Sequence, residues 1–125
     1  MIVDTDVLIW ASRAKKRATD ILERNRGFRI SLVTYAEVIQ GARNTAEVRK
    51  FQAGLRIWGA TIVHINESIS QHAMFFIERY GLSHSVELAD ALIAATALHY
   101  CEPLLTGNRK HYAVIPDLEL HDFRP

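Results

Sequence analysis

Short apolar runs alternate with longer segments of mixed polarity along the 125 residues of the chain. A short apolar run bounded by polar or turn-forming residues is typical of a strand buried in a sheet. The runs are "MIVD", "FRISLV", "ATIVHI" and "PLLT", and a weaker one lies in "LELHDF". We therefore predict strands over residues 1–4, 28–33, 60–65 and 103–106, and a weak last strand within 118–123.

The segments between these runs are predicted to be helical. A polar stretch leads to Asn25, and later segments begin at residues whose side chains can cap the first turn of a helix. We predict that further helices begin at Thr34, Thr45, Asn66 and Ser85, and that the first three end near residues 41, 59 and 81. The last helix contains "VELADALIAATAL", a nearly apolar segment with Asp90 in its middle.

Strands that alternate with helices indicate a parallel sheet whose two faces are covered by helices. The chain has no linker rich in proline, glycine or serine, and no internal repeat. Its composition, 49% apolar and 23% charged, suits one compact core. The prediction is a single α/β domain over residues 1–125, with a central, mostly parallel sheet and helices on both faces.

The composition also excludes several classes of protein. No apolar run approaches the ~20 residues that a membrane-spanning helix needs, so we expect no membrane association. The opening "MIVDTDVLIW" does not have the basic start of a secretory signal, and Cys101 is the only cysteine, which together favour the cytoplasm. The sequence contains no HExxH, P-loop, G-x-G-x-x-G or G-x-S-x-G motif, and its six histidines form no metal-ligand pattern.

The net charge of +1 favours no partner by itself, but the distribution of charge is uneven. Basic side chains predominate between Arg13 and Arg29. Such a patch suits contact with phosphates. An ordinary solvated helix face has the same pattern, so both interpretations stay open.

Polar side chains follow two of the predicted strands. Asp4 and Asp6 lie at the end of the first strand, and Thr106 and Asn108 at the end of "PLLT". Ligands of open α/β sheets bind beyond the carboxyl ends of the strands. We therefore expect these side chains to converge at one edge of the sheet, although for the two aspartates a simple turn gives the same pattern.

Two further acids lie near the starts of predicted helices. Thr34 and Glu37 have the T-x-x-E spacing of a capping box, in which Glu37 would only bond the helix start. Asp90 has no such explanation, because its helical neighbours are apolar or acidic and include no lysine or arginine. An unpaired buried carboxylate is costly, so a bound cation explains Asp90 better.

Oxygen ligands without a nearby histidine or cysteine suit Mg²⁺ or Mn²⁺. Carboxylates that hold one or two such ions can activate water and neutralise charge on a phosphodiester. The acids therefore predict metal-assisted hydrolysis.

Four segments, "MIVDTDVLIW", "SLVTYAEVIQGA", "DALIAATAL" and "LLTGNRKHY", resemble in order and spacing the PIN-domain family of metal-dependent ribonucleases, and within it the VapC-type toxins of bacterial toxin–antitoxin pairs. The resemblance covers essentially the whole chain. It implies that Asp4, Glu37 and Asp90 hold Mg²⁺ or Mn²⁺, and that Thr106 orders these acids. Asn108 stands where many members have a fourth acid, which implies weaker binding of a second ion.

The same resemblance implies partners. It implies an RNA substrate, typically transfer or ribosomal RNA, a cognate antitoxin whose tail enters the active-site groove, and a homodimer. Basic side chains should flank the acids where RNA approaches. The candidates are Arg109 and Lys110, which follow Asn108 directly, and Arg43.

Two alternatives remain at this stage. "MIVDTDVL" is also similar to the start of haloacid-dehalogenase phosphatases, in which Asp4 would be a covalent nucleophile and Asp6 a general acid. That reading gives Glu37 and Asp90 no role. The second alternative is a non-catalytic domain that binds RNA or protein.

Overall fold

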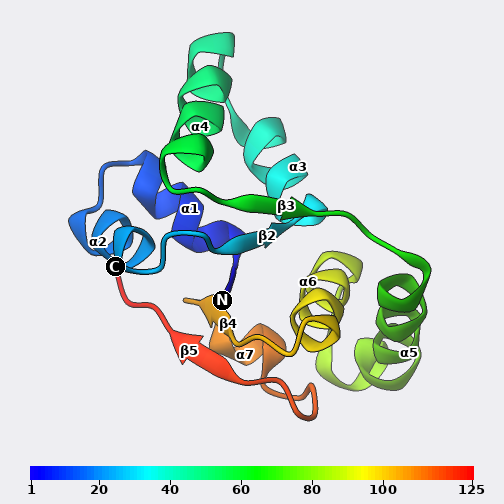
Figure 1. Ribbon diagram of the computed structural model, residues 1–125. Coiled ribbons are helices and arrows are strands. Elements are labelled where there is room, and N and C mark those ends of the chain that lie inside the picture. Colours follow the sequence, from blue (N-terminus) through cyan, green and yellow to red (C-terminus); the bar gives the residue numbers. More distant parts are fainter.

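The structure, a computed structural model, describes residues 1–125 and contains five strands and seven helices (Figure 1). The strands are β1 (Ile2–Val3), β2 (Arg29–Ser31), β3 (Thr61–Val63), β4 (Leu104–Thr106) and β5 (Leu120–Asp122). The helices are α1 (Thr5–Ser12), α2 (Lys16–Arg24), α3 (Leu32–Gly41), α4 (Thr45–Ile57), α5 (Glu67–His84), α6 (Leu88–His99) and α7 (Arg109–Tyr112). All five predicted strands are present, including the weak last one.

The strands form one sheet in the order β3-β2-β1-β4-β5, and every pair is parallel. The predicted α/β fold with a mostly parallel sheet is therefore confirmed. Strand β1 is central: Ile2 pairs with Arg29 on one side and with Leu104 on the other. The strands are two or three residues long, so the sheet is narrow and the helices supply most of the core.

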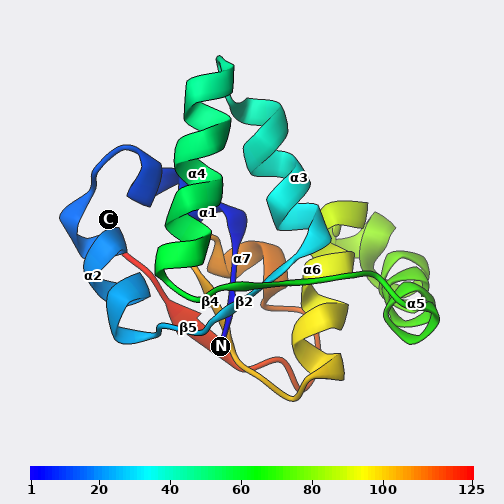
Figure 2. The ribbon, with the colours of Figure 1, turned by 45° about the horizontal axis from the view of Figure 1, so that its top comes forward.

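The central strands supply side chains to two separate hydrophobic cores. Because successive residues of a strand face opposite sides of the sheet, Ile2 belongs to one core and Val3 to the other. Leu104 and Leu105, their neighbours in β4, divide in the same way. Figures 1 and 2 show α5 and α6 side by side at one side of the molecule, while the α3–α4 hairpin stands away from the sheet.

Helix α6 buries a face made mainly of small side chains. Its alanines 91, 94, 95 and 97 are inaccessible to solvent. The small side chains let α6 approach both α5 and the sheet closely, which fixes the position of its first turn and of Asp90 within that turn. No helix in the structure combines the length and the apolar character that crossing a membrane requires.

The structure corrects three predicted helix boundaries. The polar stretch up to Asn25 forms two helices, α1 and α2, rather than one. Helix α3 begins at Leu32, two residues before Thr34, because Ser31 accepts a hydrogen bond from the Val33 N–H at 3.0 Å and caps the helix. Ser85 ends α5 in the left-handed conformation, with φ 55°, and does not cap α6.

Candidate active site

The acids lie at the topological switch point of the sheet. From β1 the chain winds outward through β2 to β3, and then returns across the sheet to β4 on the other side of β1. The carboxyl ends of β1 and β4 therefore border the crevice in which ligands of such sheets bind. Asp4 directly follows β1, and Thr106 is the last residue of β4.

Asp4 is held at this crevice by two hydrogen bonds. Its side chain is only 4% exposed. Oδ1 accepts a hydrogen bond from the Thr5 N–H at 2.8 Å, which caps α1, and Oδ2 accepts one from the Thr106 hydroxyl at 2.7 Å. The Thr106 Oγ1 in turn accepts from the Asn108 N–H at 2.9 Å. Thr106 thus links the loop after β4 to the acid after β1.

Glu37 joins the same edge through Thr5 rather than through a cap. It lies in the second turn of α3, and the capping-box explanation is wrong because Ser31 is the cap. The Thr5 hydroxyl is 2.6 Å from Glu37 Oε1 and 3.1 Å from the Thr34 Oγ1. A hydroxyl has one proton, so Thr5 donates to the closer carboxylate and Thr34 donates to Thr5.

Asp6 occupies a tight place beside the loop after β4. Its Oδ2 accepts a hydrogen bond from the Gly107 N–H at 2.8 Å, while its Oδ1 is buried and has no hydrogen-bond partner. A Cβ on residue 107 would lie 2.5 Å from Asp6 Oδ2 and 3.2 Å from the Phe123 carbonyl oxygen. Only glycine allows this close approach, so Gly107 is part of the site.

Asp90 lies in the first turn of α6, where the positive end of the helix dipole favours a carboxylate. The His111 Nδ1 is 3.8 Å from Asp90 Oδ1. The expectation that no histidine lies near the acids is therefore wrong. Next to His111, Tyr112 is 1% exposed, and its hydroxyl lies among the negative charges of Asp4 and Asp90, which add to burial in raising its pKa.

Burial and nearby negative charge raise the pKa of three aspartates of the site, Asp4, Asp6 and Asp90. Burial raises the pKa of Asp4, and the charge of Glu37 raises it further, against the hydrogen bonds that lower it. Burial, with the charge of Asp4, raises the pKa of Asp6 to about 6. Burial also raises the pKa of Asp90, and the nearby His111 offsets part of this rise. A cation placed among these carboxylates would relieve the repulsion that each now experiences.

The chain itself supplies no lysine or arginine to these acids. The four acids of the site are Asp4, Asp6, Glu37 and Asp90. Every Lys or Arg ion pair in the structure involves a carboxylate outside this set, and only His111 approaches one of the four. Arg109 pairs with Asp122 at 2.9 Å, and Lys110 is exposed next to it. Arg43 pairs with Glu47 at 3.0 Å beyond the far end of α3, ~15 Å along that helix from the sheet.

The donors present fit a hydrated divalent ion rather than a closed protein cage. No three His, Cys, Asp or Glu side chains lie close enough together to form a complete metal site by themselves. Mg²⁺ commonly keeps several waters and takes only one or two protein carboxylates, with substrate phosphates completing the shell. The unpartnered Oδ1 of Asp6 and the repelled carboxylate of Asp4 are acceptors of the kind that such an ion or its waters contact.

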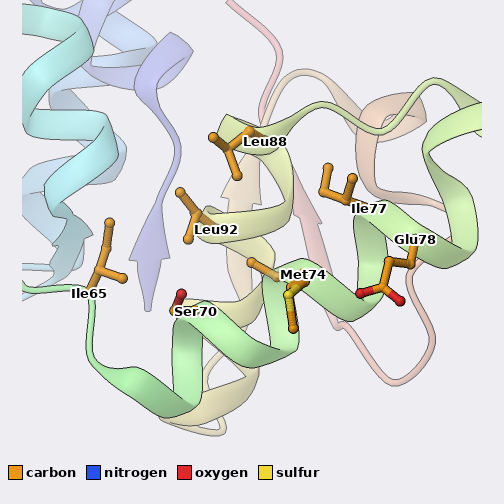
Figure 3. Close-up of a pocket in the computed structure, with 8 residues that line it drawn as sticks. Ile65, Ser70, Met74, Ile77, Glu78, Leu88 and Leu92 are labelled. Atoms are coloured by element: carbon orange, nitrogen blue, oxygen red, sulfur yellow. The ribbon is translucent and has the colours of Figure 1, made fainter.

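A separate hollow lies between α5 and α6. It has a volume of about 430 Å³ and opens beside Ile65, Met74, Leu88 and Leu92 (Figure 3). Its lining is mainly apolar and includes none of the acids at the switch point. The hollow is therefore distinct from the acidic site, although Leu88 begins the helix that carries Asp90.

Three residues of this site were not predicted from the sequence. Gly107, His111 and Tyr112 reach the acids only because β4 and β1 are neighbours. A local signal existed for Gly107, which follows the end of a predicted strand. For His111 and Tyr112 there was none beyond their closeness in sequence to Asn108.

Comparison with known families identifies the class. The family model described as PIN domain matches residues 1–115, so the chain belongs to the PIN-domain family. Nuclease activity is the general function of PIN domains, and divalent metal ions are their general cofactor. This membership leaves the phosphatase reading of Asp4 and Asp6 without support. A comparison with curated proteins finds no match.

Solved structures of similar chains point to the toxin–antitoxin members of the PIN-domain family. A chain of a toxin–antitoxin complex from Klebsiella pneumoniae is 27% identical, with a TM-score of 0.80 and 98% of each chain covered. A chain of VapBC-1 from nontypeable Haemophilus influenzae is 26% identical, with a TM-score of 0.77, and 97% of this chain and 96% of that one are covered. VapBC2 from Rickettsia felis, solved with a promoter DNA fragment, is 22% identical over 98% of each chain, and its TM-score of 0.75 shows a shared fold.

Proposed function

We propose that this protein is a metal-dependent endoribonuclease, and that it is the VapC-type toxin of a toxin–antitoxin pair. The observation that carries the enzymatic proposal is Asp4, a buried carboxylate at the switch point with other acids and no lysine or arginine around it. Such an arrangement costs stability unless a cation binds there. The general activity of the family supports the same conclusion.

In this proposal Asp4, Glu37 and Asp90 would hold a hydrated Mg²⁺ or Mn²⁺, directly or through its water ligands. When bound, the ion supplies neutralising charge at the phosphodiester and makes water a better nucleophile. Thr106 fixes the Asp4 carboxylate through its 2.7 Å hydrogen bond, and Thr5 fixes Glu37 at 2.6 Å. These hydroxyls limit the rotation of the two carboxylates, so the acids are already oriented when an ion arrives.

Asn108 is proposed as a weaker, neutral oxygen ligand. Its backbone N–H is already engaged with Thr106, which fixes its position at the edge of the site. The Asn108 side chain is exposed. A neutral amide oxygen attracts a second ion less than a carboxylate would, so one ion binds more firmly than two.

RNA is proposed to approach over the loop that follows β4. Arg109 and Lys110 lie there, and both are exposed. Because Arg109 is paired with Asp122, Lys110 is the freer cation for a phosphate. Arg43 lies farther away, at the tip of the α3–α4 hairpin, so it would contact a more distant part of a folded RNA such as a transfer or ribosomal RNA.

The toxin assignment rests on the chains that this one resembles. Two structures more than 25% identical to it are described as a toxin–antitoxin complex and as VapBC-1. We therefore propose a cognate antitoxin partner, a homodimeric toxin and a cytoplasmic location. The acidic site is a suitable receptor for an arginine or lysine of the antitoxin, because it has unpaired carboxylates.

Total RNA provides the test of the enzymatic proposal. The purified protein is incubated with it in Mn²⁺, in Mg²⁺ or in EDTA, and new RNA ends are mapped by sequencing. We expect defined cleavage sites that depend on metal, disappear with Asp90→Asn and persist with Glu119→Gln, an exposed acid outside the site. RNA binding without cleavage would instead indicate the non-catalytic domain. No metal-dependent cleavage of any RNA class would overturn the proposal.

Co-expression with the product of a neighbouring small open reading frame tests the toxin assignment. We expect the two proteins to co-purify, and cleavage of RNA to fall when they do. Light scattering of the free toxin should give twice the chain mass of 14.2 kDa. A monomer that ignores the neighbouring product would contradict this part of the proposal while leaving the nuclease activity intact.

A further inference from the structure

His111 holds a singular position among the histidines of the chain. It lies on α7, the short helix between β4 and β5, and its Nδ1 is 3.8 Å from Asp90 Oδ1. The His111 side chain is half exposed, and no hydrogen bond of its ring is present in the structure. The imidazole is therefore directed at the acidic site without being engaged there.

The backbone around His111 is well anchored. Its N–H donates to the Asn108 carbonyl oxygen at 2.9 Å, which closes the turn of α7. The next residue, Tyr112, is 1% exposed and fixes the helix to the core. The position of the imidazole next to Asp90 thus follows from the fold and not from a mobile loop.

The 3.8 Å separation between the two side chains fits shared ligation better than a direct bond. It exceeds the usual length of an N–H···O hydrogen bond. Two ligands of one ion, each bonded at about 2.1–2.2 Å, lie roughly 3.0–4.4 Å apart, according to whether they are adjacent or opposite. An ion between Asp90 and His111 needs no large movement of either residue.

We propose that His111 is a nitrogen ligand of the ion that Asp90 binds, and that it makes the site prefer a transition-metal ion to Mg²⁺. This inference rests on the proposed function, because it concerns the same metal site. Mg²⁺ prefers oxygen ligands, whereas imidazole nitrogen favours first-row transition metals. The chain thereby departs from an all-oxygen site by one side chain contributed from α7.

The test measures metal binding directly and does not depend on cleavage. Mn²⁺ is titrated into the metal-free protein by calorimetry, and pulsed electron paramagnetic resonance of the bound Mn²⁺ detects a coordinated nitrogen nucleus. Wild-type protein should show a nitrogen coupling, which His111→Gln abolishes. The Kd for Mn²⁺ should rise about tenfold in this variant, which corresponds to ~1.4 kcal/mol, while the Kd for Mg²⁺ changes by less than about twofold.

His121→Gln is the matched control. His121 is also half exposed and lies 3.2 Å from a carboxylate, Glu119, but it is on β5 and forms no ion pair with any of the four acids. Its replacement should leave both the nitrogen coupling and the Mn²⁺ affinity unchanged. Circular dichroism confirms that each variant is folded before the metal is added.

The possible outcomes separate this inference from the proposed function. Saturable Mn²⁺ binding that Asp4→Asn removes, but without a nitrogen coupling, would overturn the role of His111 and leave the carboxylate site standing. A nitrogen coupling that persists in His111→Gln would likewise overturn it. Absence of any Mn²⁺ or Mg²⁺ binding that depends on Asp4 would instead refute the proposed metal site itself.

Discussion

Acidic side chains at the two ends of the central strands differ in whether a basic group pairs with them. At the amino ends, Glu102 accepts from the N-terminal ammonium of Met1 and lies 3.3 Å from the Arg29 Nε, and the Arg29 guanidinium stacks over Tyr100 at 4.5 Å. At the carboxyl ends, Asp4 and its acidic neighbours have no lysine or arginine within ion-pairing distance. The same strands β1, β2 and β4 connect both ends.

The carboxylate at the amino ends is paired within the chain and stabilises the fold, whereas the carboxylates at the carboxyl ends are available to a ligand. A paired carboxylate such as Glu102 is stabilised within the chain, and its ion pair with Arg29 joins the start of β2 to the residues that precede β4. An unpaired buried carboxylate lowers stability, so its presence needs another explanation. In the proposed function, a cation that comes from outside the chain supplies that explanation at the carboxyl ends.

Asp4→Asn should have the largest effect. Loss of a group that hydrogen-bonds to a metal ligand commonly lowers metal affinity or activity 10–100-fold, so loss of the ligand itself should lower RNA cleavage roughly a hundredfold or more. Asparagine can still accept at the start of α1, so thermal unfolding should stay close to that of wild type. Initial cleavage rates and melting curves are measured on the same preparation. Loss of folding together with activity would contradict the prediction.

Asp6→Asn should raise the stability of the metal-free protein at pH 7. The folded pKa of Asp6, about 6, lies above its unfolded value, so the folded state holds a proton that the unfolded state has released between about pH 4 and 6. Stability therefore falls as pH rises through this window, and asparagine removes that fall. Melting temperatures in EDTA from pH 4 to 7 test this. A gap between variant and wild type that does not grow with pH would refute it.

Glu102→Gln should lower stability by about 1 kcal/mol and leave cleavage unchanged. The carboxylate is partly buried between two positive groups, so its loss removes more than an exposed pair contributes. Asp20→Asn, which breaks the exposed pair of Asp20 with Lys16, is the control and should cost less. Urea unfolding at pH 7 measures both. Slower cleavage by folded Glu102→Gln protein would contradict the purely structural role of the amino ends.

Lys110→Gln should have the smallest effect, a few-fold weaker binding of RNA at low salt. Removal of one phosphate contact should also reduce the slope of log affinity against log salt by about 0.7–0.9. Lys50→Gln, an exposed lysine of α4, is the control. Binding to a catalytically silent Asp4→Asn background, measured across a salt series, gives the slope. An unchanged slope would place the RNA elsewhere.

Much of the fold followed from the sequence, because its strands are short apolar runs with polar ends. The positions of Asp4 and Thr106 followed for the same reason, since parallel strands bring their carboxyl ends to one edge. Helix boundaries were less predictable. Thr34 and Ser85 both have good capping side chains, but tertiary packing placed Thr34 in the core and Ser85 at the end of α5.

The parts of the site that sequence could not supply are its long-range contacts. Asp90 and His111 are separated by the end of α6, all of β4 and the following loop, so no local spacing relates them. The Thr5 bridge to Glu37 likewise depends on how α1 and α3 pack. Residue types indicated oxygen ligands, whereas the arrangement that adds a nitrogen to them is a property of the folded chain.

Asp4 ends a strand, caps a helix and carries the central carboxylate of the site. A single-nucleotide change converts an aspartate codon into an asparagine codon, and asparagine preserves the cap while it removes the charge. For the proposed toxin, this change is a short mutational route to a protein that still folds but no longer cleaves RNA. Such silenced alleles should accumulate at this codon in survivors.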